Sequence, residues 1–251
     1  MQYKINTMKK RILMMLAALL LCGAGTVRAQ RTYVLAVGVA HYNDSNANLH
    51  HPDRDAIRVK SLMEQHYKDV TVMTSRYATH DAVLNKLREI GGQCKAEDRI
   101  VFFFSGHGFR GGLMAYDTFI RFDELLKEFK RANAGTKICL IDACKSGSLV
   151  TLDDSGKPSW AGLAGDSTMA FVVSCRAEEL SIESPLVSAG LFTNALLKAL
   201  RGLADTDGNK SITLDEMFTY LYGDIVKHSG GRQHPQLIAT PRMRNEAFLA
   251  W

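Results

Sequence analysis

The chain lacks a long hydrophobic run and, beyond its first 29 residues, an excess of either charge. It carries 31 Lys and Arg against 26 Asp and Glu, and five of the basic residues but no acidic residue lie in residues 1–29. The rest of the chain is therefore neutral and lacks the excess of basic residues by which proteins bind nucleic acid. A composition of 46% hydrophobic and 23% charged residues also excludes a disordered, collagen-like or coiled-coil chain.

Cysteine is scarce and irregularly spaced. The five cysteines are Cys22, Cys94, Cys139, Cys144 and Cys175. They form no CxxC pair and no paired Cys/His spacing of the kind that predicts zinc. An exported chain can oxidise an even set of cysteines, but one of this length does not need disulfides to fold. Cys139 lies in an apolar, strand-like run, where we expect a buried free thiol.

The first 29 residues have the pattern of a secretory signal peptide. Basic residues up to Arg11 precede ten apolar residues, 12–21, and Val27-Arg28-Ala29 suits a cleavage site. Ten residues fall well short of the ~20 that span a bilayer, so we expect no membrane span in the mature chain. Cleavage after Ala29 leaves residues 30–251 as a single domain. We expect that domain to be periplasmic or secreted, with lipid attachment through Cys22 as the alternative.

Short apolar runs rich in Val, Ile and Phe recur along the remaining chain. They occupy residues 33–39, 70–73, 99–104, 137–142 and 169–174. Stretches with helical spacing of apolar residues lie between most of them, at 53–66, 80–90 and 122–131. The run from Ile100 to Phe104 does not alternate with polar residues, as expected of a strand covered on both faces. This order predicts an α/β fold with a doubly wound, mostly parallel sheet flanked by helices.

Two of the predicted strands end in residues with nucleophilic and acid–base chemistry. Ligands of such sheets bind beyond the carboxyl ends of the strands, where Ser105–Gly108 reads S-G-H-G and Asp142–Gly147 reads D-A-C-K-S-G. If these strands are neighbours, His107 and Cys144 form a base and a thiol nucleophile for acyl transfer. The N–H groups of Gly108 and Cys144 would then stabilise the oxyanion. On spacing alone, a structural histidine and a buried loop cysteine remain the alternative.

A rival nucleophile is Cys175, because it also follows a predicted strand, at 169–174. Its neighbours lack the glycine-containing turn that would present the thiol at the sheet edge. We therefore prefer Cys144.

The two segments resemble the His and Cys motifs of the caspase-like cysteine peptidases, and among these the bacterial metacaspase-like members. The order of the motifs is also that of the family. The similarity extends over nearly the whole mature chain, through Asp55–Ala56, Ala78–Thr79, Ser174–Arg176, Gly190–Thr193 and His234–Gln236. The resemblance implies the caspase-hemoglobinase fold, protein or peptide substrates, and a catalytic dyad of His107 and Cys144 that requires no cofactor.

Asp142 departs from the Gln-Ala-Cys signature of true caspases. Residues two apart on a strand point the same way, so Asp142 lies on the side of Cys144, and Ser105 on the side of His107. Both can then line the primary specificity pocket. In metacaspase-like enzymes the matching Asp accepts a basic side chain, so the resemblance implies cleavage after Arg or Lys. The alternative for Asp142 is a structural cap.

Residues 147–167 contain a cluster of Asp, Ser, Gly and Pro, which predicts a mobile loop. Because caspase-like enzymes are often activated by self-cleavage, the resemblance also implies a self-processing zymogen. The sequence locates neither the cleavage site nor the oligomeric state.

A calcium-loop pattern lies within a predicted helix–loop–helix at about 190–227. Oxygen-bearing side chains occupy positions 1, 3, 5, 7, 9 and 12 of an EF-hand-like loop, namely Asp205, Asp207, Asn209, Ser211, Thr213 and Glu216. Position 6, which is glycine in EF-hands, is Lys210. One interpretation is a calcium ion that stabilises this hairpin. The other is a plain turn between helices with Thr213 as N-cap.

The leading hypothesis is an exported cysteine endopeptidase that cleaves after Arg or Lys. The alternative from a different class is a binding or regulatory protein that keeps the caspase-like fold without activity. A third, a thiol transpeptidase or amidase acting on cell-wall peptides, fits export but not the sequences of the two motif turns.

Overall fold

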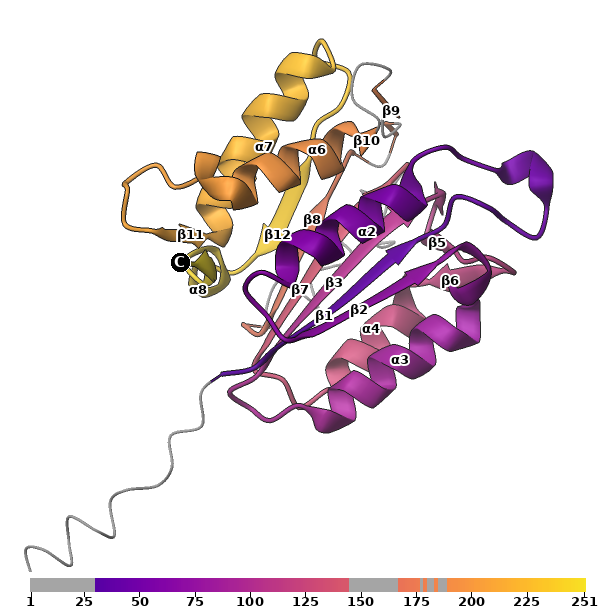
Figure 1. Cartoon of the computed structure of the whole chain (residues 1–251), viewed down its shortest axis with the longest axis horizontal. Helices are drawn as coiled ribbons and strands as arrows, with labels where there is room; N and C mark the ends of the chain where they lie inside the picture. The colour runs from indigo at the N-terminus through magenta and orange to yellow at the C-terminus, as the bar shows by residue number, and fades with distance from the viewer. Residues whose placement is uncertain (1–29, 145–166, 177, 180–182, 185–188) are drawn as a thin grey trace, which may run out of the picture. The chain divides into compact units, whose positions relative to one another are not determined.

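A six-stranded β-sheet forms the centre of the protein (Figure 1). The computed structural model describes residues 30–144, 167–176, 178–179, 183–184 and 189–251. The strand order is β12-β8-β7-β3-β1-β2, and every neighbouring pair is parallel except β12 with β8. The bounds are β1 (Thr32–Gly38), β2 (Asp69–Thr74), β3 (Arg99–Gly106), β7 (Thr136–Ala143), β8 (Met169–Val173) and β12 (Gln236–Ala239). The five predicted strands are confirmed, and β12 is the strand of this sheet that the prediction missed.

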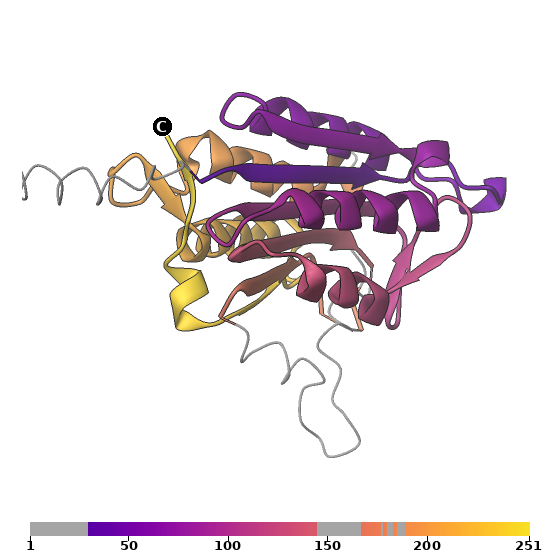
Figure 2. The ribbon, with the colours of Figure 1, turned by 90° about the horizontal axis from the view of Figure 1, so that it is seen from below.

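Helices cover both faces of this sheet (Figures 1 and 2). On one face, here the α2 face, lie α2 (Pro52–Met63), α6 (Leu191–Lys198) and α7 (Leu214–His228). On the other, the α3 face, lie α3 (His80–Gln93) and α4 (Phe122–Arg131). The doubly wound architecture predicted from the sequence is therefore confirmed.

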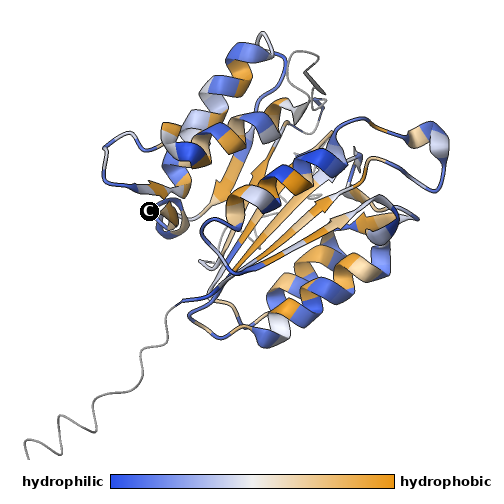
Figure 3. Ribbon diagram, viewed as in Figure 1, coloured by the Kyte–Doolittle hydropathy of each residue, from blue (hydrophilic) through white to orange (hydrophobic). Residues whose placement is uncertain are grey.

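The strands are apolar on both sides because each face is covered (Figure 3). Side chains alternate between the faces, so in β3 Val101 and Phe103 join the core of the α2 face, whereas Phe102 and Phe104 join that of the α3 face. These four side chains are at most 1% exposed. The run of apolar residues in β3 is thus explained by the burial of both faces of the strand, as predicted.

Several smaller elements have no clear signal in the sequence. A three-stranded antiparallel sheet, β4 (Gly108–Phe109), β5 (Gly112–Met114) and β6 (Phe119–Arg121), lies between β3 and α4 in the chain. The short pair β9 (Glu183–Ser184) and β10 (Ala189–Gly190) precedes α6. Near the end of the chain, α8 (Pro241–Arg244) leads into β13 (Ala247–Ala250), which pairs with β11 (Ser211–Thr213). Two 3-10 turns, η1 (Ser45–Ala47) and η2 (Ser75–Tyr77), follow β1 and β2.

The predicted helix–loop–helix at 190–227 corresponds to α6 and α7. A π-helical segment, η4 (Ala199–Leu203), extends α6, and β11 precedes α7. Thr213 caps α7 as predicted, because its hydroxyl accepts a hydrogen bond from the Glu216 N–H. The loop predicted at 147–167 lies, up to residue 166, outside the described residues.

None of the four cysteines within the described residues is in a disulfide. Cys94, Cys139 and Cys175 are buried, and Cys144 is half-buried. Burial raises the pKa of Cys139 well above its ordinary value. Among the described residues, no helix combines the length and the apolar character needed to cross a membrane.

Close packing of α2 on the end of β1 requires a glycine. A Cβ atom at Gly38 would lie 2.2 Å from the Pro52 carbonyl oxygen and 2.9 Å from the Ala56 Cβ. Both contacts belong to the turn of α2 that carries Asp55, so Gly38 sets how closely that residue approaches the sheet.

We expect Gly38→Ala to lower the free energy of unfolding by about 1–3 kcal/mol, the usual cost of overpacking a filled core. The measurement is urea denaturation. Gly223→Ala in α7 is the control, because its added methyl group meets nothing within 4 Å. A glycine in a helix interior is less stable than alanine by up to ~1 kcal/mol, so this variant should gain stability. Equal stabilities for the two variants would contradict the packing argument.

Candidate active site

The predicted histidine and cysteine leave neighbouring strands at the same edge of the sheet. In the β3–β7 register, Ser105 pairs with Asp142 and Gly106 with Ala143. His107 and Cys144 each follow the last pair, and such strands lie ~4.8 Å apart. The structure therefore places the two predicted residues next to each other.

The turn after His107 lies directly against Cys144. A Cβ atom at Gly108 would lie 2.2 Å from the Cys144 carbonyl oxygen, so only glycine allows this approach. The backbones of Gly108 and Cys144, whose N–H groups are the predicted oxyanion donors, thus lie directly against each other.

The His107 imidazole is held by the loop that follows β1. Its Nε2 atom lies 2.8 Å from the Ala47 carbonyl oxygen. Because a carbonyl only accepts hydrogen bonds, this contact assigns the ring hydrogen to Nε2 and leaves the lone pair on Nδ1. The Tyr42 ring packs against the imidazole with centroids 5.1 Å apart. The Tyr42 hydroxyl accepts a hydrogen bond from the His107 N–H at 2.8 Å.

Two carboxylates are buried beneath this edge, on the α2 face. Asp55 of α2 is 1% exposed and Asp142 of β7 is 5% exposed. Asp55 Oδ2 accepts hydrogen bonds from the Ser105 hydroxyl at 3.2 Å and the Gly190 N–H at 3.3 Å. A Cβ atom at Gly190 would lie 2.4 Å from Asp142 Oδ2. Ser105, the register partner of Asp142, and Gly190 therefore bring the two carboxylates together.

Asp142 is fixed by the first turn of α6. Its Oδ2 atom accepts hydrogen bonds from the Thr193 N–H at 3.1 Å and the Thr193 hydroxyl at 2.7 Å. A helix N-terminus and direct hydrogen bonds both stabilise a negatively charged carboxylate. Asp142 thus caps an element, as the alternative interpretation expected, but that element is the N-terminus of α6 and not the loop that follows Asp142.

Asp55 is the site residue that motif reasoning missed. Burial, reinforced by the nearby charge of Asp142, raises its pKa to about 8. Its Oδ1 atom is buried and has no hydrogen-bond partner among the described residues. The signal in the sequence is an Asp on the buried face of an amphipathic helix, among Ala56, Val59 and Leu62. A carboxyl group is costly at such a position.

Cys175 has the surroundings of a structural thiol. It is 0% exposed. Its sulfur lies 3.5 Å from the Ala143 carbonyl oxygen and 3.4 Å from that of Glu179, both within the hydrogen-bonding range of a thiol. These contacts agree with the preference for Cys144 as the nucleophile.

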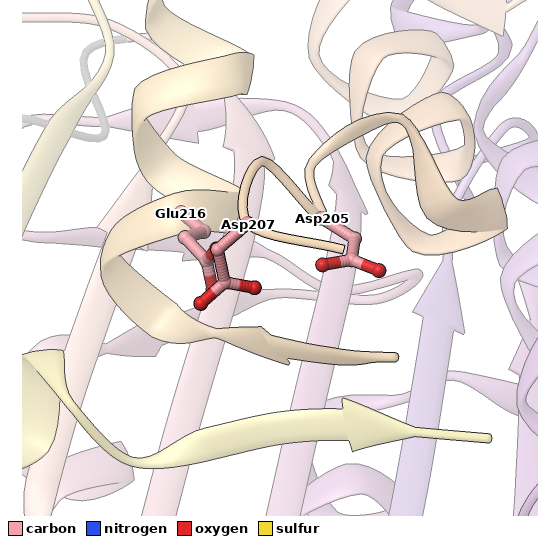
Figure 4. Close-up of side chains that lie close together, drawn as sticks. All are labelled: Asp205, Asp207 and Glu216. Atoms are coloured by element: carbon pink, nitrogen blue, oxygen red, sulfur yellow. The ribbon is translucent and has the colours of Figure 1, made fainter. Parts of the chain in front are cut away.

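The predicted calcium loop brings three carboxylates together (Figure 4). One oxygen each of Asp205, Asp207 and Glu216 lies within 4.8 Å of the others. Lys210, which stands where EF-hands have glycine, adopts the left-handed conformation itself, with φ of 64°. Carboxylate oxygens are the ligands that a calcium ion prefers. Glu216 belongs both to this cluster and to the capping box with Thr213 at the start of α7.

Comparison with known proteins shows the family to which the chain belongs. Residues 31–245 match the family model of the caspase domain, so the chain belongs to the caspase-domain peptidases. Its fold is therefore caspase-like, with a mixed, mostly parallel sheet flanked by helices, as the resemblance implied.

Two solved structures illustrate the shared fold. Protein GSU0716 from Geobacter sulfurreducens superposes with a TM-score of 0.65 at 16% identity, covering 88% of this chain and 98% of that one. Caspase-1 from Spodoptera frugiperda also gives 0.65 at 16% identity, covering 85% and 88%. A comparison with curated proteins gave no match.

The buried state of Asp55 predicts a pH dependence of stability. Its folded pKa of about 8 lies above its ordinary value of 3.8, so the native state holds a proton that the unfolded chain releases. The resulting stability is complete below pH ~4 and is lost as the pH rises through 8, at up to ~1.4 kcal/mol per pH unit. Urea unfolding at pH 5–9 should show this decline in the wild type and a flatter profile in Asp55→Asn. Parallel profiles, or an equal flattening in the control Glu97→Gln at an exposed position, would contradict it.

Calcium binding stays a prediction that thermal unfolding can test. Because a ligand of the native state adds ~2.7 kcal/mol at a hundredfold excess over Kd, millimolar Ca²⁺ should raise Tm by several degrees relative to EGTA. Asp207→Asn should reduce the rise and Asp81→Asn should not. If Ca²⁺ leaves the wild-type Tm unchanged and calorimetry detects no heat of binding, the loop is a plain turn.

Proposed function

We propose that this protein is a cysteine endopeptidase that cleaves after Arg or Lys. The observation that carries the proposal is the buried pair Asp55 and Asp142 beside the dyad. A buried carboxyl oxygen without a partner is costly, and a guanidinium or ammonium group from a substrate would supply the missing donors. An acidic substrate residue would add a third carboxylate to the same site.

The chemistry follows from the two neighbouring strand ends. The Cys144 sulfur attacks the carbonyl carbon, a C–S bond forms, and the thiol proton passes to His107 Nδ1. The N–H groups of Gly108 and Cys144 stabilise the resulting oxyanion. When the C–N bond breaks, His107 returns the proton to the leaving amine, and water then hydrolyses the thioester to regenerate the thiol.

The Ala47 carbonyl contributes by orientation. Its hydrogen bond with Nε2 fixes the tautomer in which Nδ1 accepts the proton, and it steadies the imidazolium that forms during the reaction. Tyr42 adds packing from the side. Its pKa is raised by burial, so the phenol stays neutral and does not compete for the proton.

We further propose that the chain is exported, to the periplasm or beyond, after removal of residues 1–29. Its partners are then protein or peptide substrates with Arg or Lys at the cleavage site. As a caspase-domain protein with basic specificity, it is also a candidate for self-processing. Intact-mass analysis of the wild type and Cys144→Ala tests this, because only the wild type should be cut.

Four fluorogenic peptides that differ only in the residue before the scissile bond test the specificity. The residues are Arg, Lys, Asp and norleucine. We expect cleavage of the Arg and Lys peptides alone, abolished by Cys144→Ala. Asp142→Asn should lower kcat/KM for Arg by about a hundredfold, because losing one partner of a buried charged pair costs ~2–5 kcal/mol. Asp55→Asn should have a smaller effect of the same sign, and the exposed control Asp81→Asn should have none.

Preference for Asp would reject the role of the carboxylates and leave the dyad standing. If no peptide is cleaved, an irreversible thiol-reactive probe distinguishes an inactive precursor from a protein without catalytic activity. Selective labelling of Cys144 indicates a competent site that awaits activation. No labelling indicates a caspase-like binding protein without activity.

A further inference from the structure

A cavity of about 340 Å³ opens where β1 and β2 end. Its volume is within the ~300–1,000 Å³ typical of ligand pockets. Most of its wall is apolar, and it is lined by three tyrosines, Tyr42, Tyr77 and Tyr116, together with His41, Thr74, Ser75 and Arg76. The chemistry proposed above uses none of this wall except Tyr42.

The cavity lies on the far side of His107 from Cys144. The strand order places β7, which carries the cysteine, next to β3, which carries the histidine, and then β1 and β2. Tyr42 connects the two regions, because it lines the cavity and also packs on the imidazole at 5.1 Å. Tyr42 is thus shared by the cavity wall and the candidate active site.

The cavity and the buried carboxylates also belong to opposite faces of the sheet. Asp55 lies on α2 and contacts Ser105 from the α2 face. Tyr42 belongs to the core of the α3 face, and Tyr116 packs against that core. A substrate that places its basic side chain on the first face must therefore cross the sheet edge at His107 before it reaches the second.

The proposed mechanism determines which part of the substrate passes over the sheet edge at His107. The residue before the scissile bond is held by the carboxylates, and its carbonyl lies at Cys144. The leaving amine must lie beside His107 to receive a proton. The segment that follows the scissile bond therefore begins at the imidazole, next to Tyr42.

We propose that this cavity binds a large apolar or aromatic side chain from one of the first two residues after the scissile bond. The inference rests on the proposed endopeptidase function and adds a second specificity site to it. Arg76 is a cation in the wall, so a basic residue at the same position is disfavoured.

The wall is held in place before any substrate arrives. Tyr77 is 62% exposed, yet its hydroxyl accepts a hydrogen bond from Arg76 at 2.8 Å, and the guanidinium lies 4.9 Å from its ring centroid. The Ser75 hydroxyl donates to Asp53 at 2.6 Å and accepts from the His41 N–H at 3.0 Å. A preorganised aromatic wall loses little conformational entropy on binding.

Quenched peptides that are identical up to the Arg before the scissile bond test the inference. Either of the two following positions carries Phe, Leu, Gly or Lys. In the wild type, kcat/KM for the best Phe or Leu peptide should exceed that for Gly at least tenfold, and Lys should fall below Gly. Tyr77→Ala should reduce the preference to less than threefold and leave the Gly peptide unchanged. Tyr222→Ala, an exposed tyrosine on α7, should behave like the wild type.

A gain-of-function variant and a minimal substrate distinguish a loss of side-chain recognition in the cavity from misfolding of the variant. Arg76→Glu should raise kcat/KM for the Lys peptide about tenfold relative to Gly, which a misfolded variant cannot do. An arginine methyl ester has no residue after the scissile bond, so Tyr77→Ala should hydrolyse it at the wild-type rate. Cys144-dependent hydrolysis without the Phe or Leu preference, or with one that Tyr77→Ala leaves intact, overturns this inference alone. Failure to hydrolyse any substrate, together with no labelling of Cys144 by the thiol-reactive probe, overturns the proposed function and this inference with it.

Discussion

The in-register pairing of β3 with β7 is the constraint on which the candidate site depends. It sets Ser105 beside Asp142 and Gly106 beside Ala143, so that His107 and Cys144 emerge together. A shift by one residue would turn every side chain of one strand to the other face. Asp142 would then leave the α2 face, and the apolar residues that bury β7 would be misplaced. The same pairing of β3 with β7 therefore buries the apolar side chains of the core and positions the residues of the candidate site.

The second constraint is the cost of keeping two carboxyl groups out of water. Asp142 is compensated by α6, through two hydrogen bonds from Thr193. Asp55 accepts hydrogen bonds on one oxygen only, and a pKa raised to about 8 by burial favours its neutral acid form at neutral pH. A bound cation would reverse that preference and favour the charged form. The specificity that we propose thus uses both groups, the Asp142 carboxylate and the Asp55 oxygen that has no partner among the described residues.

The parts of this protein that sequence could predict are those with a local signal. Apolar runs predict the buried strands, and the glycines on either side of His107 predict a turn at the end of a strand. The Ala47 carbonyl that orients the imidazole has no such signal, because any residue supplies a carbonyl. Asp55 lies 50 residues before its partner Ser105, and only the placement of α2 on the sheet joins them. The helix N-terminus that holds Asp142 is likewise a product of tertiary structure.

The sheet edge also explains why one histidine can serve both halves of a cleaved peptide. His107 lies between β7 and the loop after β1, so the nucleophile is on one side of the imidazole and the Tyr42 wall on the other. In the mechanism that we propose, the proton that His107 takes from Cys144 is needed on the leaving amine, and Ala47 and Tyr42 hold the ring that carries it. Because the carboxylates and the aromatic cavity lie on opposite faces, neither recognition element has to move for the other to be filled. We therefore expect the residue before the scissile bond and the residues after it to be recognised by different side chains. His107 lies between these two sets of side chains.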